Sequence, residues 1–490
     1  MKKLIIITII SAGLLVQSCT KVDENVYDKY TADQFFADPK GPDIALASVY
    51  ARMPQFGGGD NGYYDTNNMS TDEQVVPHRV SGDWGPENAY LYTRAWTPAL
   101  GQINTTWNAC YNSIYLANLA VDQLVKANAP AAKISEVKIL RAWFYYLLID
   151  DFGDVPFYTD NNITTAQLKT QTRTQIFNWI VGEITANADL LPETKGGVFY
   201  GRFNKWAAYT FLAKMYLNAG VYTGTPKWAE CLAACTKVTT GGFTLHPGTA
   251  NASSPLGNRY FELFGDVCPD DETILAIWLK RNVIGNNVLA LRSVNGPNGV
   301  AMFGYAGWNG TIVPEETYNK YTADDIRRKQ FLIGPQPGGV TYTPKVTSLI
   351  NPGAGITEGV RGVKFYPVAP NDGSGSSNDF PIYRYADVLL MIAECNVRLG
   401  NAAAAKPFID QVRLRAGLAA LPSNPTLDNI YDERGFELNW EGHRRQDMIR
   451  FGTFTLGHGL VPAVDSHWQL FPIPTAAMNA NPNLKQNPGY

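Results

Sequence analysis

The sequence predicts a mainly α-helical fold in which helical hairpins support a second, irregular lobe. Two observations carry this prediction. Apolar residues recur at helical spacing in two long parts of the chain, one before residue 240 and one after residue 383. The part between them is rich in glycine, proline, asparagine and aspartate, and its strand-like runs are short, such as residues 273–278. We therefore expect one helical lobe and one lobe built from loops and short strands.

The helical stretches follow one another in pairs along the chain. Their apolar stripes cover residues 103–125, 139–149, 176–184, 206–216, 388–399, 405–416 and 427–451. Pro407 falls within the sixth stretch, which implies a kink or a later helix start there. Such pairs approach the roughly 34-residue period of tetratricopeptide repeats, although the repeat's consensus residues are missing at fixed offsets. We expect tetratricopeptide-like packing rather than true repeats.

The first 18 residues have the features of a lipoprotein signal peptide. Lys2 and Lys3 precede an apolar stretch over residues 4–16, and the small residue Ser18 stands directly before Cys19. The stretch is shorter than the about 20 residues that span a membrane. We expect cleavage before Cys19 and acylation of its thiol and new amino group, since several acyl chains anchor stably. In the alternative, the signal is an ordinary secretory one and Cys19 is incidental.

Three regions are expected after the signal peptide. Residues 19–240 hold the first helix pairs together with inserted aromatic loops, residues 241–383 form the irregular lobe, and residues 384–490 form a C-terminal helical region. The formal net charge is −3 and no long run of lysine or arginine occurs, so nucleic acid is excluded as a partner. Cys231 and Cys235 fit better as small buried residues than as metal ligands, because no second ligand pair follows them.

Sequence motifs of known catalytic or cofactor-binding function are absent or lack the secondary structure that they require. Residues 57–62 match the dinucleotide-binding pattern G-x-G-x-x-G, but we expect no strand before them and no helix after them. Adjacent acids such as Asp72 and Glu73 are expected to be solvated rather than catalytic. Glutamates recur every four residues at Glu433, Glu437 and Glu441, among arginines. We favour a structural ion-pair network over a catalytic acid ladder there.

Aromatic residues in glycine-rich loops are the functional candidates. One cluster includes Asp83, Trp84 and Trp96, and a second includes Trp308 and its neighbours Tyr305 and Asn309. A flat indole matches the apolar face of a sugar ring, and neighbouring polar side chains satisfy its hydroxyl groups. This pattern predicts a solvent-facing glycan site. The alternative is that each tryptophan belongs to the core.

Six stretches, in the same order along the chain, carry a resemblance to the SusD/RagB family of nutrient-uptake outer-membrane lipoproteins. They are residues 107–114, 140–156, 201–222, 383–394, 437–452 and 470–490, including the strings WNACYNSI at 107–114 and ELNWEGHR at 437–444. The resemblance implies a SusD-like α-α superhelix with tetratricopeptide-like hairpins and an irregular second lobe. It also implies display on the outer membrane, facing the exterior and capping a SusC-like TonB-dependent barrel.

The same resemblance implies a protein that binds oligosaccharides without cleaving them. Family members of the starch type use aromatic residues with arginine, aspartate and asparagine, and the stretch around Trp84 and Trp96 is similar to theirs, which makes an α-glucan the expected ligand. The candidate glycan-binding residues are Asp72, Arg79, Asp83, Trp84, Trp96, Tyr305, Trp308 and Asn309. We expect no catalytic residue and no cofactor, although a structural calcium ion is compatible with this interpretation.

Two other functions stay open at this point. The protein could be a surface glycoside hydrolase that uses two of the loop acids, which release of reducing ends from a bound glycan would reveal. It could also be a tetratricopeptide-like scaffold for protein interaction with no small ligand. Co-purification of a barrel partner together with a blank glycan panel would indicate the scaffold.

Overall fold

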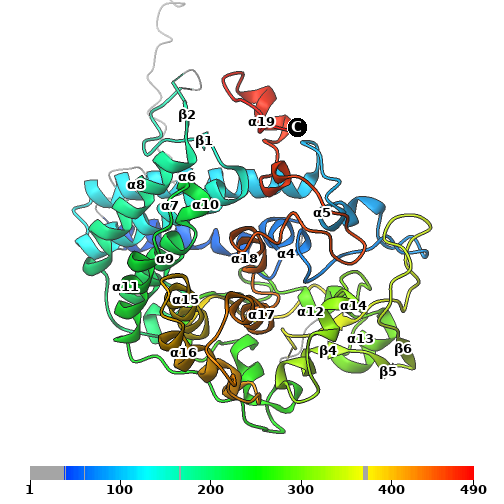
Figure 1. Cartoon of the computed structure of the whole chain (residues 1–490). Helices are drawn as coiled ribbons and strands as arrows, with labels where there is room; N and C mark the ends of the chain where they lie inside the picture. Colours follow the sequence, from blue (N-terminus) through cyan, green and yellow to red (C-terminus); the bar gives the residue numbers. More distant parts are fainter. Residues whose placement is uncertain (1–37, 39, 60, 165–166, 368–372) are drawn as a thin grey trace, which may run out of the picture.

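A computed structural model describes residues 38, 40–59, 61–164, 167–367 and 373–490. The expected signal peptide and the expected lipidation site Cys19 lie outside the described residues. Within the described part, helices dominate and strands are short, as the sequence predicted (Figure 1). None of the helices described is both long and apolar enough to cross a membrane.

The first group of helices forms one side of the molecule, drawn in blue to green in Figure 1. It comprises α3 (Gly41–Tyr50), α6 (Gly101–Lys126), α7 (Ala131–Phe152), α8 (Arg173–Asn187), α9 (Lys205–Leu217), α10 (Ala219–Thr223) and α11 (Trp228–Thr239). Within this series α6 packs on α7, α7 on α8, and α9 on α11. Helix α7 lies deepest, because residues 139–152 are all buried.

The C-terminal helices extend this layer. They are α15 (Tyr385–Arg398), α16 (Ala402–Arg415), α17 (Leu427–Glu437), α18 (Arg444–Arg450) and α19 (Thr475–Ala480). Helix α15 packs on both α11 and α16, so the two groups form one continuous helical scaffold. Helix α16 begins at Ala402 and runs through Pro407, so the alternative of a later helix start is wrong. Cys231 and Cys235 of α11 are buried with free thiols, as expected of small core residues.

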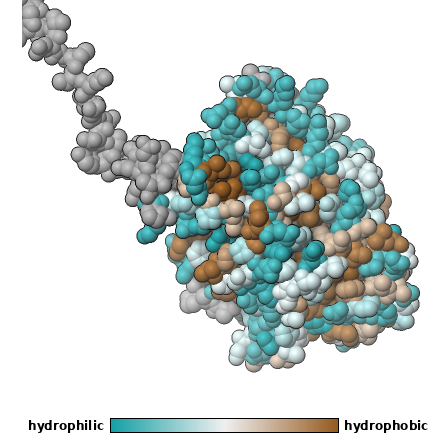
Figure 2. Space-filling view, turned by 90° about the vertical axis from the view of Figure 1, so that its left-hand side faces the viewer, coloured by the Kyte–Doolittle hydropathy of each residue, from teal (hydrophilic) through white to brown (hydrophobic). Residues whose placement is uncertain are grey.

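The outer face of the helical scaffold, at the left of Figure 1, is seen head-on in Figure 2. Apolar residues occur there in several separate patches among hydrophilic ones. Exposed apolar side chains on helices of the scaffold include Leu119 and Val125 of α6, and Leu414 of α16. Scattered exposure of this kind is ordinary for a globular protein.

The remaining elements are short and build the loop-rich lobe and the connections. The helices are α4 (Tyr63–Met69), α5 (Tyr90–Thr93), α12 (Leu289–Ser293), α13 (Gly296–Phe303) and α14 (Glu315–Asn319). The strands are β1 (Val155–Pro156), β2 (Thr170–Gln171), β3 (Thr273–Ile277), β4 (Phe331–Leu332), β5 (Gly334–Gln336), β6 (Val340–Tyr342), β7 (Arg361–Gly362) and β8 (Phe380–Arg384). The 3-10 helices are η1 (Met53–Phe56), η2 (Pro86–Ala89), η3 (Ala188–Leu190), η4 (Gly197–Phe199), η5 (Pro255–Gly257), η6 (Arg259–Phe264), η7 (Ile326–Gln330) and η8 (Ser466–Gln469).

The strands form antiparallel two-stranded sheets, with β1 on β2, β3 on β8, β4 on β7 and β5 on β6. The strand expected over residues 273–278 is confirmed as β3, whose five residues are all buried. Its partner β8 leads directly into α15, so this pairing fastens the irregular lobe to the helical scaffold.

The expectation that no helix opens after residues 57–62 is wrong, because α4 begins at Tyr63. The segment before the glycines is the 3-10 helix η1 and not a strand. The dinucleotide fingerprint requires both a strand and a helix, so its rejection stands.

The single helix expected over residues 427–451 is also wrong, because the chain breaks it between α17 and α18. Trp440 and Gly442 have φ values of +63° and +81°, which redirect the chain. The break is held by Glu73: its carboxylate accepts the Trp440 backbone N–H at 2.9 Å, and its carbonyl accepts the Trp440 indole Nε1–H at 3.3 Å. A left-handed tryptophan persists only where such contacts fix it.

A buried network of ion pairs surrounds this segment and confirms the structural role expected for the spaced glutamates. Glu437 pairs with Arg327 at 3.1 Å, with Arg384 at 2.9 Å and with Arg415 at 2.5 Å. These arginines come from η7, β8 and α16, so one carboxylate connects the irregular lobe to the helical scaffold. Burial alone would raise the pKa of Glu437, but Arg415, Arg384 and Arg327 overcome it and hold that pKa well below its usual range.

Replacing Glu437 by glutamine should destabilise the fold strongly. The change leaves three buried guanidinium groups without one of their charged partners, and breaking a buried pair in this way costs about 3–5 kcal/mol. Urea unfolding measures the loss. The control is Asp122→Asn, which breaks the ion pair between Asp122 and Lys126. These side chains are 54% and 58% exposed, respectively, so the change should alter stability by at most about 1 kcal/mol. Equal effects of the two changes would contradict the structural role of the network.

Glu73 should make stability fall as the pH rises. Burial raises the pKa of its carboxyl to about 8 in the folded protein, against about 4.3 in an unfolded chain. Its contribution is therefore fully present below about pH 4 and is lost as the pH rises through 8. We expect the urea midpoint of the wild type to fall between pH 6 and pH 9 more steeply than that of Glu73→Gln. Parallel pH curves for the two proteins would show that Glu73 keeps an ordinary pKa.

Candidate functional site

An open groove in the loop-rich lobe brings together four of the predicted site residues. Asp83 and Trp84 contribute from one loop, and Trp308 and Asn309 from another. The groove encloses about 680 Å³, within the range typical of ligand sites. Its lining residues are Ser81, Asp83, Trp84, Asn295, Gly296, Pro297, Gly307, Trp308, Asn309 and Ile356.

Backbone hydrogen bonds to α12 and the turn after it fix the position of Trp308. The Trp308 N–H donates to the Leu291 carbonyl at 2.9 Å, and the Asn309 N–H donates to the Val294 carbonyl at 2.9 Å. The close approach needs glycine at position 307, since a Cβ there would lie 2.2 Å from the Val294 carbonyl oxygen. The loop is therefore held rigidly against the scaffold before any ligand binds.

The two tryptophans of the groove are linked through the same loop. The indole Nε1–H of Trp84 donates to the Trp308 carbonyl at 2.8 Å. The ring of Trp84 lies against Gly310, where a Cβ would come within 2.7 Å of the indole carbons. Trp84 is half-buried and serves mainly as a wall. Trp308 is likewise half-buried, but its indole makes no hydrogen bond or ring contact with the described residues, so its exposed part is available to a ligand.

Arg79 lies buried behind the groove and connects two of its loops. It is fully buried, and its guanidinium donates to the carbonyls of Asn309 at 3.0 Å, Gly310 at 3.2 Å, Gly355 at 2.8 Å and Glu358 at 3.0 Å. Burial, with help from the nearby Arg361 charge, lowers the pKa of Arg79. Arg79 therefore positions the groove loops rather than facing a ligand, which corrects the solvent-facing role expected from the sequence.

Polar groups at the groove come from Asn309 and Asp83. Asn309 adopts a left-handed backbone conformation with φ +53°, and its Oδ1 accepts from Arg361 Nη2 at 2.9 Å. No described residue accepts from its Nδ2, which leaves that amide able to donate to a ligand hydroxyl. Asp83 is exposed, and its carboxylate accepts from the Ser81 hydroxyl at 2.7 Å. The groove thus offers an aromatic face with a donor and an acceptor beside it.

Besides Arg79, three more predicted site residues do not line this groove: Asp72, Tyr305 and Trp96. Asp72 is 6% exposed and forms a two-point ion pair with Arg444 at 2.7 and 2.8 Å. Burial would raise the pKa of Asp72, but Arg444 overcomes it and holds the pKa below its usual range. The expectation that Asp72 and Glu73 are solvated is therefore wrong. Tyr305 lies outside the groove lining, and its ring stacks on Phe303 at 6.2 Å.

Trp96 is the clearest correction to the expected site. Its side chain is 2% exposed, so it has no face to offer a glycan. The indole Nε1–H donates to the Tyr490 hydroxyl at 2.8 Å, and the ring packs on Trp468 and Phe471 with centroids 4.9 Å apart. Residues from the C-terminal end of the chain cover this tryptophan and make it part of the core.

The sequence also missed residues that shape the groove. Asn295 and Pro297 stand at the start of α13, where Asn295 caps the helix by accepting the Asn298 N–H at 3.1 Å. An N-cap followed by proline is a recognisable helix start, and it could have indicated a wall at this position. Ile356 comes from a distant loop without any local signal.

The described lining of the groove differs from the pair of acids that glycoside hydrolysis typically uses. Asp83 is the one carboxylate among its lining residues, whereas glycoside hydrolysis uses a pair of carboxyl groups across the bond. Across the described residues, no group of three or more histidine, cysteine, aspartate or glutamate side chains is arranged to hold a metal ion. The structural calcium ion stays a prediction. The geometry suits binding of a neutral, hydroxylated ligand.

Two family descriptions match most of the chain. Residues 43–217 match a family described as "Starch-binding associating with outer membrane", and residues 314–490 match the SusD family. The starch-binding protein SusD of Bacteroides thetaiotaomicron is 26% identical over 512 aligned residues, which cover 88% of this chain and 86% of SusD. A SusD-like protein of Bacteroides ovatus is 24% identical and covers 91% of this chain and 82% of its own length.

Solved structures share the fold over nearly the whole chain. Surface glycan-binding protein A from Bacteroides thetaiotaomicron, in complex with laminarihexaose, superposes with a TM-score of 0.75 at 21% identity, covering 92% of this chain and 99% of that protein. A laminarin-binding SusD-like protein gives 0.72 at 21% identity, covering 92% and 100%. The mainly helical, SusD-like fold expected from the sequence is confirmed.

Trp96→Ala should destabilise the protein without touching the groove. The substitution removes a buried ring and its hydrogen bond to Tyr490, and such core truncations cost about 3–5 kcal/mol. Urea unfolding measures this loss, and Trp278→Ala is the control because that tryptophan is 45% exposed. If the Trp96 variant were as stable as the wild type but bound a glycan more weakly, Trp96 would be a ligand-binding residue and not a core residue.

Proposed function

The chain belongs to the SusD family, and from this membership we propose that it captures oligosaccharides and holds them, without cleaving them, in the groove between Trp84 and Trp308. The observation that carries the proposal is the partly exposed indole of Trp308, which lines the groove and makes no hydrogen bond or ring contact with the described residues. An aromatic face backed by a rigid loop binds a sugar ring at low entropic cost. The single carboxylate of the groove favours capture over hydrolysis.

We further propose that the ligand is an α-glucan of the starch type. The match of residues 43–217 to a starch-binding family and the similarity to SusD support this choice. Neutral glucans also suit a groove whose lining contains one acidic and no basic side chain. Because a similar structure holds laminarihexaose, a β-glucan is the competing ligand that any test must include.

The place of this function is proposed to be the outer membrane, facing the exterior. Acyl chains on Cys19 would hold the protein at the membrane, and the leader after Cys19 would tether the folded body. A SusC-like TonB-dependent barrel is the proposed partner that receives the glycan. The description of the matching family as associating with the outer membrane supports this location.

Trp308→Ala should weaken glycan binding without unfolding the protein. Calorimetric titration against maltoheptaose and laminarihexaose identifies the ligand of the wild type, and the variant should then bind it about tenfold or more weakly, as expected for a central aromatic anchor. Trp278→Ala, which removes an exposed tryptophan outside the groove, should bind like the wild type.

The same titrations separate the competing functions. Binding that is identical in wild type and Trp308→Ala would show that the groove is not the site. Release of new reducing ends from the bound glycan would show a hydrolase. No binding of either oligosaccharide, together with co-purification of a barrel partner, would indicate a scaffold for protein interaction.

A further inference from the structure

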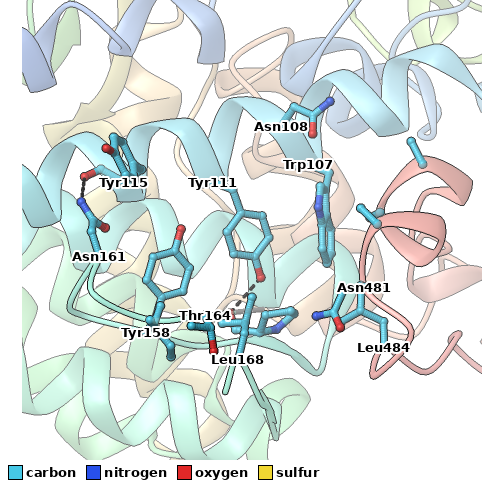
Figure 3. Close-up of a pocket in the computed structure, with 15 residues that line it drawn as sticks. Trp107, Asn108, Tyr111, Tyr115, Tyr158, Asn161, Thr164, Leu168, Asn481 and Leu484 are labelled. Carbon is cyan, nitrogen blue, oxygen red and sulfur yellow. Dashed lines mark hydrogen bonds between the residues drawn. The ribbon is translucent and has the colours of Figure 1, made fainter. Parts of the chain in front are cut away.

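A second cavity lies in the helical part of the molecule, away from the groove. It is formed by α6, the segment that follows β1, and α19 with the chain after it (Figure 3). It encloses about 490 Å³ and shares no lining residue with the groove. In Figure 1 these elements lie at the top, whereas α12 and α13 beside the groove lie at the lower right.

One wall of the cavity is aromatic. Trp107, Tyr111 and Tyr115 stand four residues apart on α6, so their side chains share one face of the helix. Tyr158 adds a fourth ring from the segment after β1 (Figure 3). The rings of Tyr111 and Tyr158 are nearly parallel, with 5° between their planes and 6.3 Å between their centroids. Tyr115 is 51% exposed, so the wall is open to solvent at one end.

Hydrogen bonds fix this wall before any ligand arrives. The Tyr111 hydroxyl donates to the Pro156 carbonyl at 2.8 Å. The Tyr145 hydroxyl donates to the Tyr158 carbonyl at 2.6 Å and accepts the Tyr158 N–H at 2.9 Å. Rings that are already held in place lose little entropy on binding, which is the usual basis of a preorganised site.

The polar groups of the cavity are neutral amides and hydroxyls. Among the described residues no charged side chain lines it, whereas Asn108, Asn161, Asn481 and Thr164 do. Asn108 is exposed on α6. The Asn481 residue is 6% exposed, its Oδ1 accepts the Asn483 N–H at 3.0 Å, and its buried Nδ2 has no acceptor among the described residues. Figure 3 shows this amide at the cavity, across from the aromatic wall. A ligand hydroxyl would supply the missing acceptor.

Flat rings beside uncharged hydrogen-bonding groups define the chemistry of the occupant. A pyranose ring has an apolar face for the tyrosines and hydroxyl groups for the amides. The described lining offers neither a cationic group to bind an anionic ligand nor a carboxylate to bind a cationic one. The cavity volume also lies within the range typical of ligand sites.

We propose that this cavity is a second site for a neutral glycan, separate from the Trp84–Trp308 groove. The choice of ligand class rests on the proposed function, and the location rests on the cavity itself. Two sites on one protein would act together on a polysaccharide, because a chain held at one site raises the effective concentration of sugar at the other. Polymers would then be retained more strongly than short oligosaccharides.

Affinity electrophoresis in gels containing glycogen or laminarin tests the proposal. Ala480→Trp fills the cavity from the exposed end of α19, and Tyr158→Ala removes one ring of the wall. Each change should weaken polysaccharide retention about tenfold, and Ala480→Trp combined with Trp308→Ala should abolish it. The matched control is Ala403→Trp, at an exposed alanine of α16 outside both sites. Thermal melts establish that each variant is folded.

The outcomes distinguish this proposal from the first. If both cavity variants migrate like the wild type while Trp308→Ala alone abolishes retention, the second site is wrong and the groove stands. If Trp308→Ala has no effect while the cavity variants abolish retention, the groove is wrong and the cavity stands. If neither polysaccharide slows the migration of the wild type, both proposed sites are wrong.

Discussion

The fold depends on a buried carboxylate at Glu437 that must be surrounded by cations. Taking a charge out of water is unfavourable unless several partners replace the solvent, so the three arginines from η7, β8 and α16 have to arrive at one point. Each of these elements belongs to a different part of the chain. The need to satisfy one charge therefore fixes the irregular lobe on the helical scaffold, and the loops of the groove extend from that lobe.

The groove is also held by a buried charged group with several partners, but here the charge is an arginine and its partners are backbone carbonyls. Arg79 is buried and binds four carbonyl oxygens from two loops, and Arg361 binds the side chain of Asn309. Loops without regular secondary structure gain a fixed shape because a buried guanidinium needs several acceptors at once. In this way a segment rich in glycine and asparagine presents Trp308 rigidly, as the proposed capture of a glycan requires.

Much of the helical scaffold could be predicted because an apolar stripe is a local signal. The break at Trp440 could not, since it depends on an acceptor at Glu73 that lies 367 residues away. Trp96 and Trp308 look alike in sequence, each in a loop beside polar residues. They differ in what packs on them. Tyr490, 394 residues from Trp96, covers the first, whereas the second stays partly exposed in the groove. Asp72 and Arg79 were misjudged for the same reason, because their partners lie far along the chain.

Capture without chemistry is the central claim for this protein, and a structure of the complex tests it most directly. Crystals of the wild type soaked with the oligosaccharide that it binds in titration should show an intact chain, with one sugar ring against the Trp308 indole and a hydroxyl within hydrogen-bond distance of Asn309 Nδ2. A ligand found only outside the groove would contradict the claim, and so would a ligand whose glycosidic bond had been cleaved.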